Sequence, residues 1–287
     1  MQIAKQLGLS TATISRLLQR ARAEGIVRIE VRDLVAPDTL GQQLSERLGL
    51  RRVSVIDSPS GSSPVTLAAP LGAMLRAEGL GSGSVLAVGW GRAMRAVLEA
   101  GLPPMPGVTV VPATGGMQQQ AAHFQINEFV RIAAGQAAGT PHFIHAPYLP
   151  SAEARPSFLA DPAISHAVAL WDRIDVAIVG VGLPHALNPP EARVATVNEQ
   201  SLVDSAGDVI RHYFDAAGTL IPWEGEERMI AVSTEQLRAA RLCIGVAVGE
   251  AKALAIAGAA RSGLISALVT DVQTAETILD HLSATGR

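Results

Sequence analysis

The chain has 287 residues and a formal net charge of −3; 48% of its residues are hydrophobic, 3% are aromatic and 17% are charged. This composition excludes a disordered chain and favours an α/β protein with close helix–sheet packing. Cys243 is the only cysteine, so no internal disulfide can form, and we expect a cytoplasmic protein. The sequence has no signal-peptide pattern and no apolar run long enough to span a bilayer, so we expect no membrane partner.

Residues 3–28 predict two short helices joined by a tight turn. The first helix is expected to end at Gly8, and Ser10 is placed to cap the N-terminus of the second. The apolar face of the second helix comprises Ile14, Leu17, Leu18 and Ala21. A strand expected over residues 26–31 completes the layout of a winged helix–turn–helix.

The other face of this second helix is polar and basic, which is typical of a recognition helix. We expect it to contact operator DNA in a major groove through Ser10, Thr11, Thr13, Ser15, Arg16 and Arg20. Residues 1–32 hold six Lys and Arg against two Asp and Glu, although the whole chain is acidic. The alternative is an ordinary helical hairpin with a solvated basic face.

A recognition helix is usually buried against two other helices, and here only one short helix precedes it. We therefore expect the native polypeptide to begin upstream of Met1, unless the linker or a partner subunit covers the same flank. The domain boundaries that we expect are a head over residues 1–35, a linker helix over residues 36–50 and one large domain over residues 51–287.

The linker segment places Leu40, Leu44 and Leu48 four residues apart, so it predicts a helix with one apolar stripe. Two interpretations remain open. The stripe packs against its own domain, or it forms a narrow seam against the same helix of a second subunit.

Beyond residue 52, short β-branched runs alternate with glycine turns and helical segments. The expected strands are Val53–Asp57, Val85–Trp90, Val108–Pro112, His142–Ala146, Val176–Val181, Leu242–Val248 and Ala267–Asp271. The expected helices are Val65–Glu78, Ala93–Ala100, Asn127–Ala138, Glu250–Ser262 and Thr274–Leu282. Buried strands that alternate with helices indicate an open, mostly parallel sheet, and such sheets bind ligands beyond the carboxyl ends of their strands.

Three strand-end loops contain the residues best suited to a ligand. Gly89, Gly91 and Arg92 begin a helix whose free N–H groups favour an anion, although Met94 replaces the third glycine of a dinucleotide motif. The second loop offers Thr114, Gly115, Gly116 and Gln118 to a polyhydroxylated ligand. The third loop places Lys252 on the first turn of the helix that follows. A simple tight turn is at least as probable for each loop alone, but together they predict a binding cleft.

Catalysis and metal binding are poorly supported by the sequence. Cys243 lies inside an expected strand and is interpreted as a small buried hydrophobe. His142 and His145 would point to opposite faces of a strand, so they could not share a metal. Asp215 is compatible with an ordinary turn, and Glu128 with stabilising its helix N-terminus. We expect no catalytic residue, metal or cofactor.

Several segments together resemble the SorC family of bacterial sugar-responsive transcriptional regulators. They are IAKQLGLSTATISRLLQRARAEGIVRIEV, VGWGRA, ATGG, INEFVRIAA, DVAIVGVG, FDAAG, VAVGEAKALAIAGAARSGLISALVTD and TAETIL. The resemblance implies a non-catalytic effector domain related in fold to glucosamine-phosphate and ribose-phosphate isomerases, a phosphorylated sugar as effector, and homodimers or homotetramers on DNA. The effector residues that it implies are Gly89, Gly91, Arg92, Thr114, Gly115, Gly116, Gln118, Asn127, Glu128, Asp215 and Lys252.

Two functions therefore compete. One is a transcriptional regulator whose operator affinity is controlled by a sugar phosphate. The other is an isomerase-type enzyme with an accessory head. The predicted recognition helix favours the regulator, since an isomerase does not need one.

Overall fold

The structure is a computed structural model, and it describes residues 10, 13, 16, 17, 38–57, 64–117, 125–183, 202 and 204–284. The chain divides into two units, residues 1–33 and residues 34–287. The predictions made for the strand over residues 26–31 and for Thr11, Ser15, Arg20 and Gln118 lie outside the described residues.

The described residues of the first unit test two predictions about the recognition helix: that Ser10 caps it and that Leu17 lies on its buried face. Thr13, Arg16 and Leu17 are helical, and Ser10 precedes them outside the helix. The Thr13 backbone N–H donates to Ser10 Oγ over 3.1 Å, which confirms Ser10 as an N-cap. Leu17 was expected to face inward, and this expectation is wrong, because its side chain is 51% exposed.

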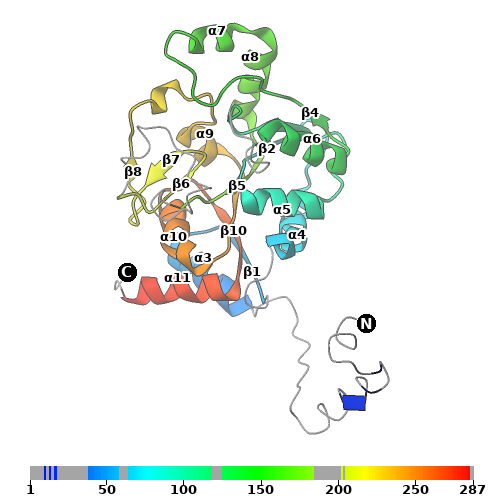
Figure 1. The fold of residues 1–287 in the computed structure, drawn as a ribbon, viewed down its shortest axis with the longest axis vertical. Coiled ribbons are helices and arrows are strands. Elements are labelled where there is room, and N and C mark those ends of the chain that lie inside the picture. The colour runs from blue at the N-terminus through cyan, green and yellow to red at the C-terminus, as the bar shows by residue number, and fades with distance from the viewer. Residues whose placement is uncertain are drawn as a thin grey trace. The chain divides into compact units, whose positions relative to one another are not determined.

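The second unit is built on a seven-stranded sheet in which every strand pair is parallel (Figure 1). The strand order is β1-β10-β9-β5-β2-β3-β4. The strands are β1 (Arg52–Ile56), β2 (Val85–Val88), β3 (Thr109–Pro112), β4 (Thr140–Pro141), β5 (Val176–Gly180), β9 (Leu242–Val246) and β10 (Ala267–Asp271). The predicted open parallel α/β sheet is therefore confirmed.

Helices cover both faces of this sheet, so alternate strand residues enter two cores. On β2, Val85 and Ala87 belong to one core and Leu86 and Val88 to the other. One face is covered by α4 (Ala68–Glu78), α5 (Arg92–Ala100) and α6 (Ile126–Ala137). The other face is covered by α3 (Asp38–Leu48), α8 (Pro162–Ala169), α9 (Thr234–Ala239), α10 (Ala253–Arg261) and α11 (Val272–Ala284).

The remaining short helices are α7 (Arg155–Ala160) and the 3₁₀ turns η1 (Pro64–Leu67), η3 (Leu170–Arg173), η7 (Glu226–Arg228) and η8 (Glu250–Lys252). The predicted helices over residues 65–78 and 250–262 each begin with one of these 3₁₀ turns, η1 or η8. No helix within the described ranges is long and apolar enough to cross a membrane.

The linker helix α3 packs against its own domain. Leu44 is fully buried and Leu48 is 7% exposed, and both belong to the core beneath α10 and α11. The alternative of a leucine seam reserved for a second subunit is therefore wrong for these two side chains.

Two parts of the fold depart from the sequence prediction. The strand expected over residues 142–146 is wrong: the edge strand is β4 at Thr140–Pro141, and the backbone of Ile144 bonds to the Asn127 side-chain amide in place of a strand partner. A second, antiparallel sheet was missed. It consists of β6 (Gly207–Val209), β7 (His212–Phe214) and β8 (Leu220–Ile221).

Candidate functional site

The strand order brings three predicted loops to one edge of the sheet. Strands β9, β5, β2 and β3 are adjacent and parallel, so the three predicted loops, which follow β2, β3 and β9, leave from the same edge. From β2 the chain moves outward to β3 and β4, and it then returns to the other side of β2 as β5. Ligands of open α/β sheets bind at such a reversal of strand order.

The loop after β2 packs closely on its surroundings before it starts α5. A Cβ on Gly89 would lie 2.9 Å from Ile210 Cδ1 and 3.3 Å from Val179 Cα, so this position requires glycine. Gly91 has a φ of 125° and caps α5, whose first residue is Arg92. Arg92 is exposed at this helix N-terminus, where the helix dipole favours an anion.

The loop after β3 is held on both sides by backbone hydrogen bonds. The N–H of Gly115 donates to the Ile230 carbonyl, and that of Gly116 donates to the Ala146 carbonyl, both over 2.8 Å. Thr114 is 1% exposed. A Cβ on Gly115 would lie 2.6 Å from the Ala146 oxygen. The two glycines therefore permit close backbone approach, and their N–H groups are engaged within the chain.

Lys252 ends η8 beside the carboxyl end of β5. Its Nζ donates to the Val181 carbonyl over 2.7 Å. The pKa of Lys252 is lowered to about 8: burial lowers it most, the nearby Arg92 guanidinium also lowers it, and the Asp208 carboxylate opposes both effects. The loops that follow β2 and β9, together with strand β6, thus place two cations and one carboxylate close together.

We call Arg92, Lys252, Asp208 and Arg211 the strand-end cluster; Asp208 and Arg211 were not predicted from the sequence. The Arg211 N–H donates to Asp208 Oδ2 over 3.0 Å. Gly182, just beyond β5, leaves room for Asp208: a Cβ on Gly182 would collide with Oδ1. Arg211 is 6% exposed, and its guanidinium carbon lies 5.6 Å from the centre of the Trp90 ring. The group therefore combines three cationic side chains with one carboxylate, and the Arg211 guanidinium itself lies against Trp90, Tyr213 and Met117. The alternation of Val209, Arg211 and Tyr213 with other residues was the only sign of a strand in this part of the sequence. The segment contains no recognisable turn motif, so the hairpin was not predicted.

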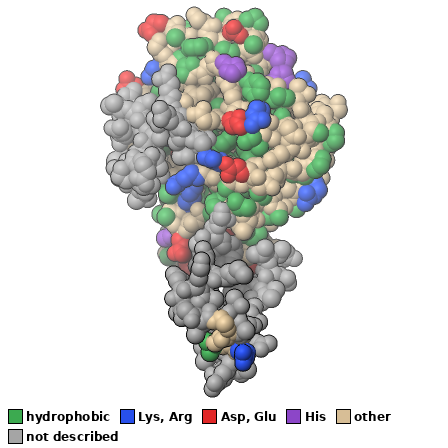
Figure 2. All heavy atoms as spheres, turned by 45° about the vertical axis from the view of Figure 1, so that its right-hand side comes forward, with side chains coloured by type: hydrophobic (Ala, Val, Ile, Leu, Met, Phe, Trp, Pro, Cys, Tyr) green, Lys and Arg blue, Asp and Glu red, His purple; other side chains and the backbone are tan. Residues whose placement is uncertain are grey.

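Asn127 and Glu128, two of the effector residues implied by the resemblance, contact other parts of the chain. Asn127 exchanges hydrogen bonds with the backbone of Ile144, over 3.1 and 3.2 Å. The Glu128 carboxylate pairs with Arg131 over 2.8 Å, and this pairing lowers the pKa of Glu128. Figure 2 shows acidic and basic side chains beside one another on the face over α5 and α6.

Asp215 lies in the turn between β7 and β8, where Oδ1 accepts the N–H groups of Ala217 and Thr219 over 2.9 and 2.8 Å. A Cβ on Gly258 would lie 2.6 Å from the Asp215 carbonyl oxygen, so this turn touches the C-terminal half of α10. Lys252 precedes that helix, roughly 9 Å away along its axis. The Asp215 side chain is engaged in holding its own turn.

The candidate reactive groups behave as structural residues. Cys243 is buried in β9, and burial raises the pKa of its thiol to about 12, so the interpretation as a buried hydrophobe is confirmed. His142 and His145 do not share a strand. The ring centre of His142 lies 5.2 Å from that of His166, and burial, followed by His166, lowers the pKa of His142. In the part of the chain that the structure describes, no three His, Cys, Asp or Glu side chains are grouped to hold a metal.

Comparisons with known proteins extend over nearly the whole chain. The family described as "Putative sugar-binding domain" matches residues 32–280. The chain is 32% identical to the sorbitol operon regulator of Klebsiella pneumoniae, over 97% of this chain and 92% of the relative. It is 28% identical to the deoxyribonucleoside regulator of Bacillus subtilis, over 98% and 92%.

The fold agrees with the sequence matches. It resembles the crystal structure of the full-length sorbitol operon regulator SorC from Klebsiella pneumoniae with a TM-score of 0.77, at 30% identity over 97% of this chain and 92% of that one. The chain therefore belongs to the sugar-binding-domain family that includes SorC.

Proposed function

We propose that this protein is a transcriptional regulator whose operator affinity is controlled by a phosphorylated sugar bound at the strand-end cluster. The observation that carries the proposal is the match to named regulators over nearly all of both chains. A sugar-binding domain joined to a basic N-terminal segment is the arrangement that such a regulator needs.

The chemistry of the cluster supports an anionic effector. Lys252 lies near Arg92 and Asp208, and the Arg211 backbone is bonded to Asp208, so the group holds three cationic side chains and one carboxylate in a partly buried setting. A phosphate dianion offsets the net positive charge of this group, and charge-assisted hydrogen bonds are among the strongest polar contacts in proteins. Gly89, Gly91 and Arg92 would contribute the N-terminus of α5, and Lys252 would face the phosphate. Thr114, Gly115, Gly116, Gln118, Asn127, Glu128 and Asp215 remain candidates for second contacts to the sugar.

Operator DNA would be contacted by a winged helix–turn–helix over residues 1–35. The Ser10 cap supports a helix that starts where a recognition helix is expected. The base-reading side chains would be Thr13 and Arg16, flanked by Ser10, Thr11, Ser15 and Arg20. The linker helix over residues 36–50 would join this head to the effector domain over residues 51–287, and a homodimer or homotetramer would match a symmetric operator.

We further propose that the sugar phosphate is an effector and not a substrate. Lys252 and Asp208 are engaged in internal contacts, and the thiol of Cys243 is buried. This leaves them poorly placed for proton transfer or nucleophilic attack on a ligand.

A thermal-shift screen of phosphorylated sugars, each paired with its unphosphorylated form, tests the proposal. We expect at least one phosphorylated sugar to raise the melting temperature, and its unphosphorylated form not to do so. A turnover assay on every hit follows. A hit that is converted to product would favour an isomerase, and a screen in which only unphosphorylated sugars stabilise the protein would contradict an anion site.

A further inference from the structure

The turn between β6 and β7 has an unusual backbone. Val209 pairs with His212, so Ile210 and Arg211 alone form the connection. Both have positive φ values, 51° and 65°. Two-residue hairpin turns of this kind favour Asn-Gly, and a β-branched residue at positive φ is a true outlier. Such strain persists only where the surroundings enforce it.

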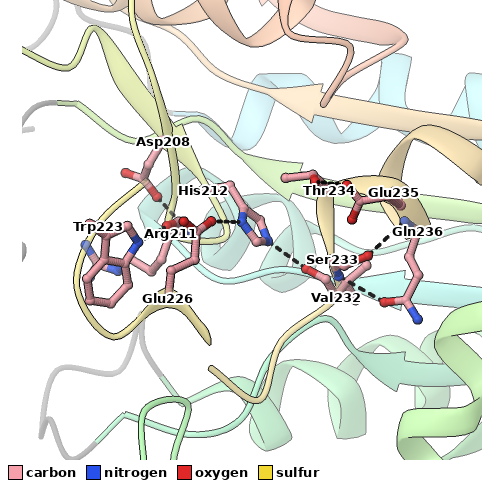
Figure 3. Close-up of polar contacts among 10 residues, drawn as sticks. All are labelled: Asp208, Arg211, His212, Trp223, Glu226, Val232, Ser233, Thr234, Glu235 and Gln236. Carbon is pink, nitrogen blue, oxygen red and sulfur yellow. Dashed lines mark hydrogen bonds and ion pairs between the residues drawn. The ribbon is translucent and has the colours of Figure 1, made fainter. Parts of the chain in front are cut away.

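The surroundings of the turn do enforce it (Figure 3). Asp208 Oδ2 accepts the Arg211 N–H over 3.0 Å, and the Trp223 indole N–H donates to the Arg211 carbonyl over 3.2 Å. His212 anchors the start of β7: Nδ1 lies 2.9 Å from Glu226 Oε1, and Nε2 lies 2.8 Å from the Val232 carbonyl oxygen. The backbone of Arg211 is thus fixed on both sides.

Both side chains of the turn point at the loops that end β2 and β3. A Cβ on Gly89 would lie 2.9 Å from Ile210 Cδ1, so Ile210 packs directly on that glycine. The Arg211 guanidinium carbon lies 5.6 Å from the centre of the Trp90 ring. One guanidinium nitrogen donates to the Tyr213 hydroxyl over 3.3 Å, and the other lies 3.9 Å from Met117 Sδ.

We propose that Arg211 is a positioning residue of the anion site, held in place by this strained turn. This inference rests on the proposed function. By lying over Trp90, the guanidinium fixes the loop from Gly89 to Gly91, and so it sets the N-terminus of α5 and Arg92. The Asp208 carboxylate that holds the turn also faces Lys252, so one hairpin tip orders both cations around the anion.

The chemistry of the turn explains why the strain is retained. An Asn-Gly turn would relieve the backbone, but it would remove the planar guanidinium that now contacts Trp90 and Met117. Strain accepted for the sake of one side-chain position is typical of a functional site.

The test compares full-length variants by thermal unfolding, with inorganic phosphate as the probe and with chloride at equal ionic strength as the reference. Arg211→Asn removes the guanidinium and tolerates a positive φ. Arg211→Lys keeps the charge but has no plane to lie over Trp90. Arg238→Ala is the matched control, because Arg238 donates to the Ser262 carbonyl on α10's far end.

We expect the wild type and Arg238→Ala to show the same phosphate-induced rise in melting temperature. In Arg211→Asn that rise should be lost, and in Arg211→Lys it should be reduced, although both variants unfold cooperatively in chloride. If either folded Arg211 variant showed a phosphate-induced rise in melting temperature as large as that of the wild type, the inference would be overturned. If the wild type itself shows no rise, the anion site is wrong, and the inference falls with it. If Arg211→Asn does not fold, Arg211→Lys decides.

Discussion

Replacing Lys252 by methionine would remove one charge from the strand-end cluster and keep the apolar stem of the side chain. The ammonium donates to the Val181 carbonyl over 2.7 Å and lies near Arg92 and Asp208. A hydrogen bond to a charged group contributes about 1.5–3 kcal/mol, which corresponds to roughly tenfold to a hundredfold in affinity. We expect Lys252→Met to lower the affinity for the sugar phosphate by this factor and to abolish the effect of the sugar phosphate on operator binding. Operator binding in the absence of effector should persist.

The same side chain predicts opposite pH trends for folding and for binding. Its pKa is about 8 in the folded chain, against an ordinary value of 10.5. Between these values the unfolded chain holds a proton that the folded chain has lost, so the contribution of Lys252 to stability rises with pH across that window. Anion binding needs the charged ammonium, so sugar-phosphate affinity falls above a pH of about 8, approaching about tenfold per pH unit.

Calorimetric titrations of the identified sugar phosphate at pH 7, 8 and 9, with melting curves in the same buffers, would measure both trends. The phosphate is already a dianion over this range, so it adds no titration of its own. Both trends should be lost in Lys252→Met and kept in Arg238→Met, which changes a distant arginine. An affinity that stays constant from pH 7 to 9 in the wild type, or equal binding by Lys252→Met, would refute the reasoning.

Three further predictions concern the head, the linker and the loop after β3. Arg16→Ala should lower discrimination between operator and random DNA by about 1–3 kcal/mol in a competition gel shift; unchanged discrimination would exclude Arg16 from base contact. Leu44→Ala should lower the free energy of unfolding by about 2–5 kcal/mol in urea, because the side chain is fully buried in its own domain. A change in subunit association alone would contradict this. Gly115→Ala should destabilise the chain by about 1–3 kcal/mol in the same assay, because the added Cβ meets the Ala146 carbonyl oxygen; unchanged stability would show that the loop yields freely.

The sequence predicted the parts of the fold in which local pattern and tertiary packing agree. The β-branched runs that became β2, β5, β9 and β10 are buried on both faces, so their apolar character was unambiguous. The Ser10 cap was equally predictable, because one hydroxyl and one backbone N–H decide it locally.

The missed parts depend on contacts distant in sequence. The segment from His142 to Ala146 has strand-like residues, but Asn127 on another element takes the backbone of Ile144. The β6–β7 hairpin turns at Ile210 and Arg211, which no turn rule would select, because Asp208 and Trp223 hold the strained backbone. Neither the Asn127 contact nor the Trp223 contact could be inferred from the residues adjacent in sequence.

The candidate site likewise has some residues that could be predicted from the sequence and one that could not. Lys252 and the loop at Gly89 to Arg92 could be predicted because strand ends of a parallel sheet converge. Asp208 could not be predicted, since it reaches Lys252 only through a hairpin beside Gly182.

The measurement that tests the central claim most directly is operator binding with and without the effector. An operator selected from random DNA would be titrated with the full-length protein by fluorescence anisotropy, in the presence of the stabilising sugar phosphate or of its unphosphorylated form. The account predicts that only the phosphorylated sugar changes operator affinity, and that operator changes sugar-phosphate affinity by the same factor, because coupling between two binding sites is reciprocal. Equal operator affinity at saturating sugar phosphate and in its absence would contradict the account.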